Sequence, residues 1–170
     1  LNGDFTIDFW INILDSTIGG IVSSGQSSFS GGASAVIWDH GTQVNKISFW
    51  AENISNGSLV ATNTLNLNRW YFISIVRDNG VITIYQDGSS VSTYNSSSTI
   101  NLSASGMKVG AYWNGQINAY ITDFRIVKGT AITPASGGPT ERLTAVTNTS
   151  LLTCHLPYIA DTPPSGGTAK

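Results

Sequence analysis

The stretch RWYFISIVRDNGVITIYQDGSSVSTY, residues 69–94, decides the fold, because it holds two turn signals between runs of β-branched and aromatic residues. Asp-Asn-Gly at 78–80 predicts a tight hairpin, since Asn and Gly tolerate the positive φ that such a turn requires. This turn separates a strand at 70–77 from a strand at 81–86. Asp-Gly at 87–88 is a second turn signal, and a third short strand follows it. The stretch therefore predicts a meander of antiparallel strands.

The rest of the chain shows the same period-two pattern. One face of the first strand is apolar and the other is polar: Phe5, Ile7, Phe9, Ile11 and Ile13 against Thr6, Asp8 and Asn12. Further strands are predicted at 33–38, 45–51, 58–62, 107–113 and 118–128. All five prolines follow residue 133, which fits uninterrupted sheet before it. The sequence predicts an all-β, two-sheet antiparallel sandwich of the jelly-roll type, with essentially no helix.

Several large apolar side chains of the predicted strands are expected in the core, because an aromatic side chain buries about 150–250 Å². We expect Trp70, one of its neighbours Tyr71 or Phe72, Ile75 and Phe124 to be buried. Trp10 and Trp50 also lie inside predicted strands, and we expect them in the core or in an interface.

Composition excludes several classes of function. The chain has 170 residues, of which 11% are charged, and its net charge is −2. Without a basic cluster, nucleic-acid binding is not expected. No apolar run approaches 18 residues, so no membrane span is predicted. Cys154 is the single cysteine, so no intramolecular disulfide can form. A thiolate zinc site is not expected either, because His40 and His155 are the only histidines and neither lies in a ligand-spaced set.

Three segments, FTIDFWI, NRWYFISIVRDNGVITIYQDGSSV and MKVGAYWNGQINAYITDFRIVKG, occur in this order. They resemble the laminin G-like branch of the concanavalin A-like lectin/glucanase superfamily over roughly residues 4–129. The ending, KGTAIT…LTAVTNTSLLTC, resembles versions of the domain in bacteriophage tail and other virion structural proteins. We therefore predict a laminin G-like sandwich at 1–129, an extension at 130–156 that adds an edge strand, and a Pro/Gly-rich linker or tail at 157–170.

The superfamily includes glycoside hydrolases, but this chain is not predicted to be an enzyme. Glycoside hydrolysis needs two carboxyl groups about 5–9.5 Å apart. The hydrolases of this superfamily place them on one strand, as Glu-x-Asp-x-Glu or a close variant. Here the only glutamates are Glu52 and Glu141, and neither has another carboxylate within three residues.

Two turns combine an aromatic ring with polar side chains, as sugar-binding loops do. The first comprises Trp38, Asp39, His40 and Gly41, and the second comprises Tyr112, Trp113, Asn114 and Gly115. Both are candidate carbohydrate-binding loops. The alternative is that Trp38 and Trp113 pack into the core and the polar residues only turn the chain.

Laminin G-like domains often hold a calcium ion, so the resemblance implies a possible structural calcium site. Asp123, in the DFRI segment, is the first candidate ligand, and Asp39 is the second. The alternative is that Asp123 accepts hydrogen bonds from nearby backbone.

The leading functional hypothesis is a non-catalytic binding module on a virion surface protein such as a tail fibre, recognising host-surface carbohydrate. The alternative is a structural or assembly domain that decorates a virus particle and contacts other virion subunits, with no glycan ligand. Both place the chain on a virion surface or outside the cell, within an assembly that is a homo-oligomer.

Overall fold

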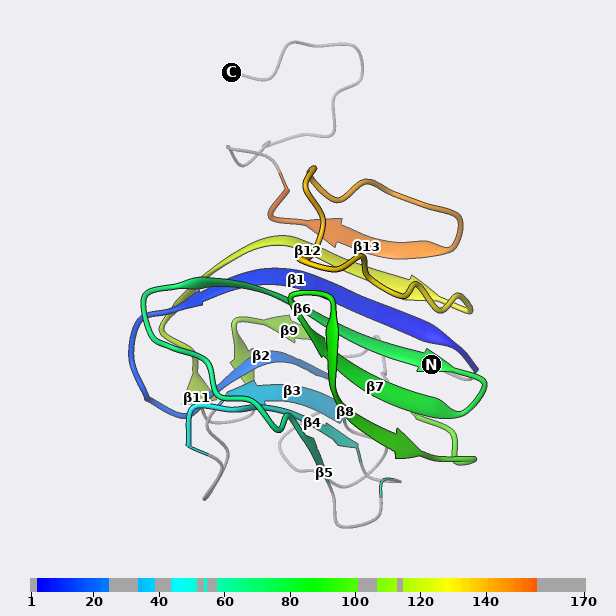
Figure 1. The fold of residues 1–170 in the computed structure, drawn as a ribbon, viewed down its shortest axis with the longest axis horizontal. Helices are drawn as coiled ribbons and strands as arrows, with labels where there is room; N and C mark the ends of the chain where they lie inside the picture. The colour runs from blue at the N-terminus through cyan, green and yellow to red at the C-terminus, as the bar shows by residue number, and fades with distance from the viewer. Residues whose placement is uncertain are drawn as a thin grey trace, which may run out of the picture.

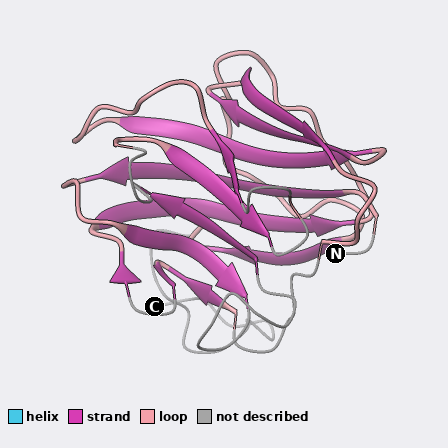
Figure 2. Ribbon diagram, turned by 90° about the horizontal axis from the view of Figure 1, so that it is seen from below, coloured by secondary structure: helices cyan, strands magenta, loops and turns pink. Residues whose placement is uncertain are grey.

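The computed structural model describes residues 3–24, 34–38, 44–51, 54, 58–100, 107–112 and 115–155. Every regular element in these residues is a β-strand, and none of them forms a helix (Figure 2). The prediction of an all-β fold is confirmed. The described part also has no helix long and apolar enough to cross a membrane.

The strands form two stacked sheets, which together make a jelly-roll sandwich (Figure 1). The six-stranded sheet has the order β13-β12-β1-β6-β7-β8. Its strands are β1 (Phe5–Ile13), β6 (Trp70–Asp78), β7 (Val81–Gln86), β8 (Ser89–Asn95), β12 (Ala119–Lys128) and β13 (Thr149–Thr153). In Figure 1 the blue β1 lies between the yellow β12 and the green β6.

The seven-stranded sheet has the order β10-β11-β2-β3-β4-β5, and β9 pairs with β2 beside this path. Its strands are β2 (Gly19–Ser24), β3 (Ser34–Trp38), β4 (Ile47–Ala51), β5 (Ser58–Val60), β9 (Lys108–Val109), β10 (Ala111–Tyr112) and β11 (Gly115–Gln116). Strands β11 and β2 run parallel, and the other strand pairs described are antiparallel.

The predicted hairpin is confirmed. Strand β6 pairs with β7 from Ile73↔Gln86 to Asp78↔Val81. The turn residues Asn79 and Gly80 have φ of 47° and 84°, as a type I′ turn requires. The following Asp-Gly turn also has positive φ at both residues and leads into β8, so the three-stranded meander is present.

The core lies between the sheets and is rich in aromatic side chains. Phe5 contacts Phe49 of the other sheet, with ring centroids 6.1 Å apart, and Phe9 stacks on Phe124 at 5.8 Å. The predicted burial of Tyr71, Phe72, Ile75 and Phe124 is confirmed.

The predicted burial of Trp70 is wrong, since this side chain is 42% exposed. Along β6, the alternate residues Tyr71, Ile73 and Ile75 belong to the core cluster. Trp70 has the opposite parity, so it lies on the outer face of the six-stranded sheet.

The end of the described chain adds an edge strand to that sheet. Strand β13 pairs with β12 from Phe124↔Thr153 to Val127↔Thr149. The segment at 129–148 connects the two strands without regular structure. The linker or tail predicted at 157–170 lies outside the described residues.

Candidate functional site

The structure contradicts the prediction for Trp38, the aromatic residue of the first candidate loop. Trp38 ends β3 with no exposed surface, and its Nε1 donates to the Asp15 carbonyl oxygen at 3.3 Å. It shares the parity of Val36, and both belong to the core cluster. The prediction that Trp38 presents its ring to a sugar is therefore wrong. Asp39 and His40 lie outside the described residues.

The second predicted loop is described only at its edges. The backbone of Tyr112 pairs with Gly115 between β10 and β11. The Tyr112 side chain, Trp113 and Asn114 lie outside the described residues. A sugar contact from this loop stays a prediction.

Asp123 forms a β-bulge between β12 and β1. The pairing shifts between Asp8↔Arg125 and Trp10↔Thr122, so Asp123 and the next residue oppose one residue of β1. Its φ of 51° lies in the left-handed region, which Asp adopts more readily than most residues. The Asp123 carboxylate accepts a hydrogen bond from the Leu143 backbone N–H at 3.2 Å. This contact is the alternative role considered for it.

Calcium at Asp123 or Asp39 stays a prediction. The described part of the chain contains no group of three or more His, Cys, Asp and Glu side chains that could hold a metal ion.

The bulge decides which β12 side chains share the outer face of the sheet. Phe124 and Ile126 point into the core, so Arg125 points outward. Without the extra residue, Tyr120 and Thr122 would have the opposite parity to Arg125 and would point inward. With the bulge, all three lie on the outer face.

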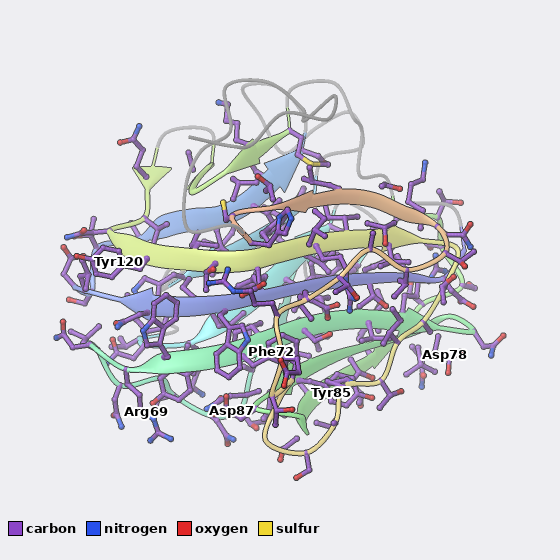
Figure 3. All side chains as sticks on the ribbon, turned by 90° about the horizontal axis from the view of Figure 1, so that it is seen from above. Arg69, Phe72, Asp78, Tyr85, Asp87 and Tyr120 are labelled. Carbon is purple, nitrogen blue, oxygen red and sulfur yellow. The ribbon has the colours of Figure 1, made fainter. Side chains whose placement is uncertain are left out.

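Residues 129–148, which we call the covering segment, cross part of this outer face. Thr6 Oγ1 donates to the Thr130 carbonyl oxygen at 3.0 Å and accepts from the Ile132 N–H at 2.8 Å. At the far side of the sheet, the Gly137 N–H donates to the Asp87 carbonyl oxygen at 2.9 Å. In Figure 3 the segment passes beside Phe72 and Asp87.

Two glycines permit this close contact. A Cβ on Gly138 would lie 2.9 Å from Phe72 Cβ, and one on Gly88 would lie 1.9 Å from the Ala135 carbonyl oxygen. Contact with the segment explains why Phe72 is only 2% exposed although it lies on the outer face.

An ion pair lies beneath the covering segment. Arg125 Nε donates to Asp8 Oδ2 at 3.0 Å, and Ser74 Oγ donates to Asp8 Oδ1 at 2.7 Å. Arg125 Nη1 also donates to the Thr144 carbonyl oxygen at 3.0 Å, which fixes the segment to the sheet. Burial raises the pKa of the Asp8 carboxyl above its ordinary value, against the opposing effect of Ser74 and Arg125. This part of the face is closed to a ligand.

The other part of the face is open. Asn12 of β1 is paired with Trp70 of β6 on one side and with Tyr120 of β12 on the other. Directly opposed residues share a face, so the three side chains form a row across three strands. Trp70 is 42% exposed and Tyr120 is 60% exposed.

A second aromatic row lies beside the first. Trp10 is opposite Phe72, with ring centroids 5.4 Å apart, and it remains partly exposed. We call Trp10, Asn12, Trp70 and Tyr120 the aromatic surface. Figure 3 shows Tyr120 near one end of the sheet, with Phe72 nearer the middle and the covering segment beyond it.

The chemistry of the aromatic surface is apolar and uncharged, with one amide at its centre. Asn12 Oδ1 is buried and has no hydrogen-bond partner among the described residues. Aromatic rings offer flat faces for apolar C–H groups, and an amide can donate and accept hydrogen bonds. The surface therefore suits a neutral ligand with both apolar faces and hydroxyls.

The sequence contained a signal for this surface that the loop predictions did not use. Trp10 falls on the polar side of the first strand, between Asp8 and Asn12. An aromatic residue on the polar face of an amphipathic strand is a candidate contact residue. Tyr120 could not be placed in the same way, because the bulge reverses its side.

Comparison with known proteins agrees with this architecture. Residues 1–136 match the model of the family Laminin_G_3, described as the concanavalin A-like lectin/glucanases superfamily. The chain belongs to this family. Among curated proteins, sequence comparison finds no significant match.

Several solved structures share the fold at low sequence identity. A Bacteroides ovatus protein proposed to bind carbohydrate is 17% identical, with a TM-score of 0.62, over 77% of this chain and 38% of that one. Domains LG4-5 of the mouse laminin α1 chain are 15% identical, with a TM-score of 0.57, over 77% and 36%. Domain 4 of AbnA, an extracellular arabinanase of Geobacillus stearothermophilus solved with arabinotriose, is 13% identical, with a TM-score of 0.55, over 74% and 60%. This chain thus spans less than two thirds of each structure.

Proposed function

We propose that this chain is a non-catalytic carbohydrate-binding module and that it binds glycan on the outer face of its six-stranded sheet. The proposal rests on the aromatic surface, where Trp70 and Tyr120 are exposed on either side of Asn12. Two structures of the same fold point to the same ligand class: the Bacteroides ovatus protein is proposed to bind carbohydrate, and AbnA domain 4 was solved with arabinotriose.

The non-catalytic part of the proposal rests on the carboxylates. Asp8, on the same face, is buried and paired with Arg125, so it is not available as an acid or a nucleophile. Glu141 is exposed in the covering segment. Glu52 lies outside the described residues.

The biological setting is part of the proposal. The resemblance of the ending to phage structural proteins supports a virion surface protein, such as a tail fibre, that recognises host-surface carbohydrate. In a homo-oligomeric assembly many weakly binding copies act together, and avidity then exceeds the affinity of one module by about 10² or more.

The test uses a multimerised form of the chain on a glycan array and in host-cell adsorption. We expect binding that Trp70→Ala and Tyr120→Ala each reduce. Val81→Ala serves as the matched control, because Val81 is a 38% exposed apolar residue at the β7 end of the hairpin, in the same sheet. Binding that neither aromatic substitution changes would move the site to the strand-end loops.

The alternative is a structural or assembly role in which the aromatic surface packs against a neighbouring virion subunit. Exposed aromatic residues also occur in protein interfaces, so the surface allows this reading. It predicts that the chain binds no glycan, self-associates in analytical ultracentrifugation, and becomes monomeric on Trp70→Ala.

A further inference from the structure

The aromatic surface has a direction as well as a composition. Tyr120, Asn12 and Trp70 lie in one line on three neighbouring strands, β12, β1 and β6. Neighbouring strands are about 4.8 Å apart, so the Cα atoms of Tyr120 and Trp70 are separated by about 9–10 Å. One sugar ring cannot lie on both aromatic side chains.

The covering segment limits the surface along the strands. The row next to the line is Thr122, Trp10 and Phe72, and its Phe72 end already lies under Gly138. One row further, Asp8 and Arg125 are buried beneath the segment. A ligand chain that followed the strand direction would meet the segment, whereas a chain lying across the strands would not.

The central side chain suits hydroxyl groups. Asn12 is partly exposed, while its Oδ1 is buried without a partner among the described residues. Rotation of the amide presents either its NH₂ group or its oxygen to the surface, so it can donate to a ligand hydroxyl or accept from one.

The charges around the surface favour a neutral ligand. None of its four residues is an Asp, Glu, Lys, Arg or His. The neighbouring Asp8 and Arg125 neutralise each other. The exposed Arg69 is at the rim, 4.9 Å from the Tyr71 ring centroid. A single cation is too little for a polyanion, whose binding depends on several phosphate or sulfate contacts.

We propose that the ligand is an extended, neutral oligosaccharide that lies across β12, β1 and β6, with separate sugar units on Tyr120 and Trp70 and a hydroxyl on Asn12. This inference rests on the proposed function and specifies the ligand class and its direction. The covering segment is the wall that excludes the alternative direction.

The test is a length series measured by isothermal titration or NMR. The probes are xylo-, cello-, manno- and laminari-oligosaccharides from the monosaccharide to the hexasaccharide, with heparin as the charged comparison. For the series that binds, we expect the affinity to rise by about tenfold or more once the oligosaccharide is long enough to cover both rings. Further sugar units should then add little affinity.

Single and double substitutions test which side chains contact the oligosaccharide. Trp70→Ala and Tyr120→Ala should each reduce the affinity for the long oligosaccharide to that of a short one, and the double variant should show no dependence on length. Asn12→Leu should weaken binding at every length that reaches it. Cooperative thermal unfolding of Trp70→Ala and Tyr120→Ala, within a few degrees of the parent chain, separates lost contacts from lost folding.

The contrary outcomes are distinct. Binding that depends on Trp70 but not on chain length overturns the cross-strand direction and leaves the proposed function in place. Length-dependent binding that neither aromatic substitution changes puts the glycan elsewhere, which overturns this inference and the outer-face site but leaves a carbohydrate-binding module in place. If only heparin binds, the neutral ligand is wrong and this inference falls, while the carbohydrate-binding function remains. If neither an oligosaccharide nor heparin binds, both this inference and the proposed function fall.

Discussion

Replacement of Arg125 by Met is the substitution whose effect on stability follows most directly from the structure. Arg125 donates to Asp8 Oδ2 through Nε and Nη2, and Asp8 is 2% exposed. The variant leaves a buried carboxylate that keeps the hydrogen bond from Ser74 Oγ but has lost its positively charged partner. Hydrogen bonds to charged groups contribute about 1.5–3 kcal/mol each, and breaking a buried ion pair costs about 3–5 kcal/mol. We expect Arg125→Met to lower the free energy of unfolding at pH 7 by about 3–5 kcal/mol.

The pH dependence of the stability of Arg125→Met is a second, independent test of the same reasoning. Burial already raises the pKa of Asp8 in the native protein, and loss of Arg125 removes two of the effects that lower it. A carboxyl whose folded pKa exceeds its unfolded value of about 3.9 binds protons more tightly in the native state. The variant should therefore regain stability as the pH falls below the raised folded pKa toward the unfolded value of about 3.9, by up to about 1.4 kcal/mol per pH unit.

Asp8→Asn is the matched comparison. Because burial favours the neutral form at position 8, this substitution should cost less than Arg125→Met at pH 7. In Asp8→Asn/Arg125→Met the buried charge is gone, so the double variant should be more stable than Arg125→Met alone. The assay is urea unfolding of all four proteins at pH 7 and at about pH 4, close to the unfolded pKa of a carboxyl. A loss below about 1 kcal/mol for Arg125→Met, or a loss that is the same at both pH values, would refute the reasoning.

Four further substitutions test the packing and the absence of catalysis. Phe72→Ala should cost about 3–5 kcal/mol because Phe72 is 2% exposed, whereas Trp70→Ala should cost about 1 kcal/mol or less; equal losses in thermal unfolding would contradict the assignment of faces. Gly88→Ala should lower stability by more than the about 1–2 kcal/mol of left-handed strain, because its Cβ would lie 1.9 Å from the Ala135 carbonyl oxygen; faster hydrogen exchange of the Gly137 amide would report the displaced segment, and an unchanged rate would argue against it. Finally, the chain should release no reducing sugar from any glycan that it binds, and release that Glu141→Gln abolishes would show it to be an enzyme.

The sequence predicted the elements that local chemistry determines. The Asn79-Gly80 turn, the β6–β7 pairing and the alternation of β1 each depend on residues close together in the chain, and all three are confirmed. Strand β2 was missed, because GGIVSS lacks the β-branched and aromatic density of the other strands. Gly19 in this strand allows a close backbone contact, because a Cβ there would lie 2.6 Å from the Ile117 backbone.

The candidate site was harder to predict because it depends on long-range geometry. The side to which Tyr120 points depends on a bulge at Asp123, where φ is positive. Phe72 is buried and Trp70 is exposed on the same face of the sheet, because the covering segment packs against Phe72. Neither can be inferred from alternation within one strand, and the core position expected for Trp70 was wrong. The prediction for Trp38 was wrong although alternation within its strand could have corrected it. Trp38 stands two residues after the core residue Val36, so its side chain also points inward.

The most direct test of glycan binding on the aromatic surface is a ¹⁵N NMR titration with the oligosaccharide series. The chain has five tryptophans, and each gives an indole N–H signal. Binding on the outer face of the six-stranded sheet predicts saturable shifts of Trp10 and Trp70, together with the Asn12 side-chain amide, while the buried Trp38 stays unchanged. Shifts confined to Trp113 or Trp50, with Trp10 and Trp70 unmoved at saturation, would contradict it.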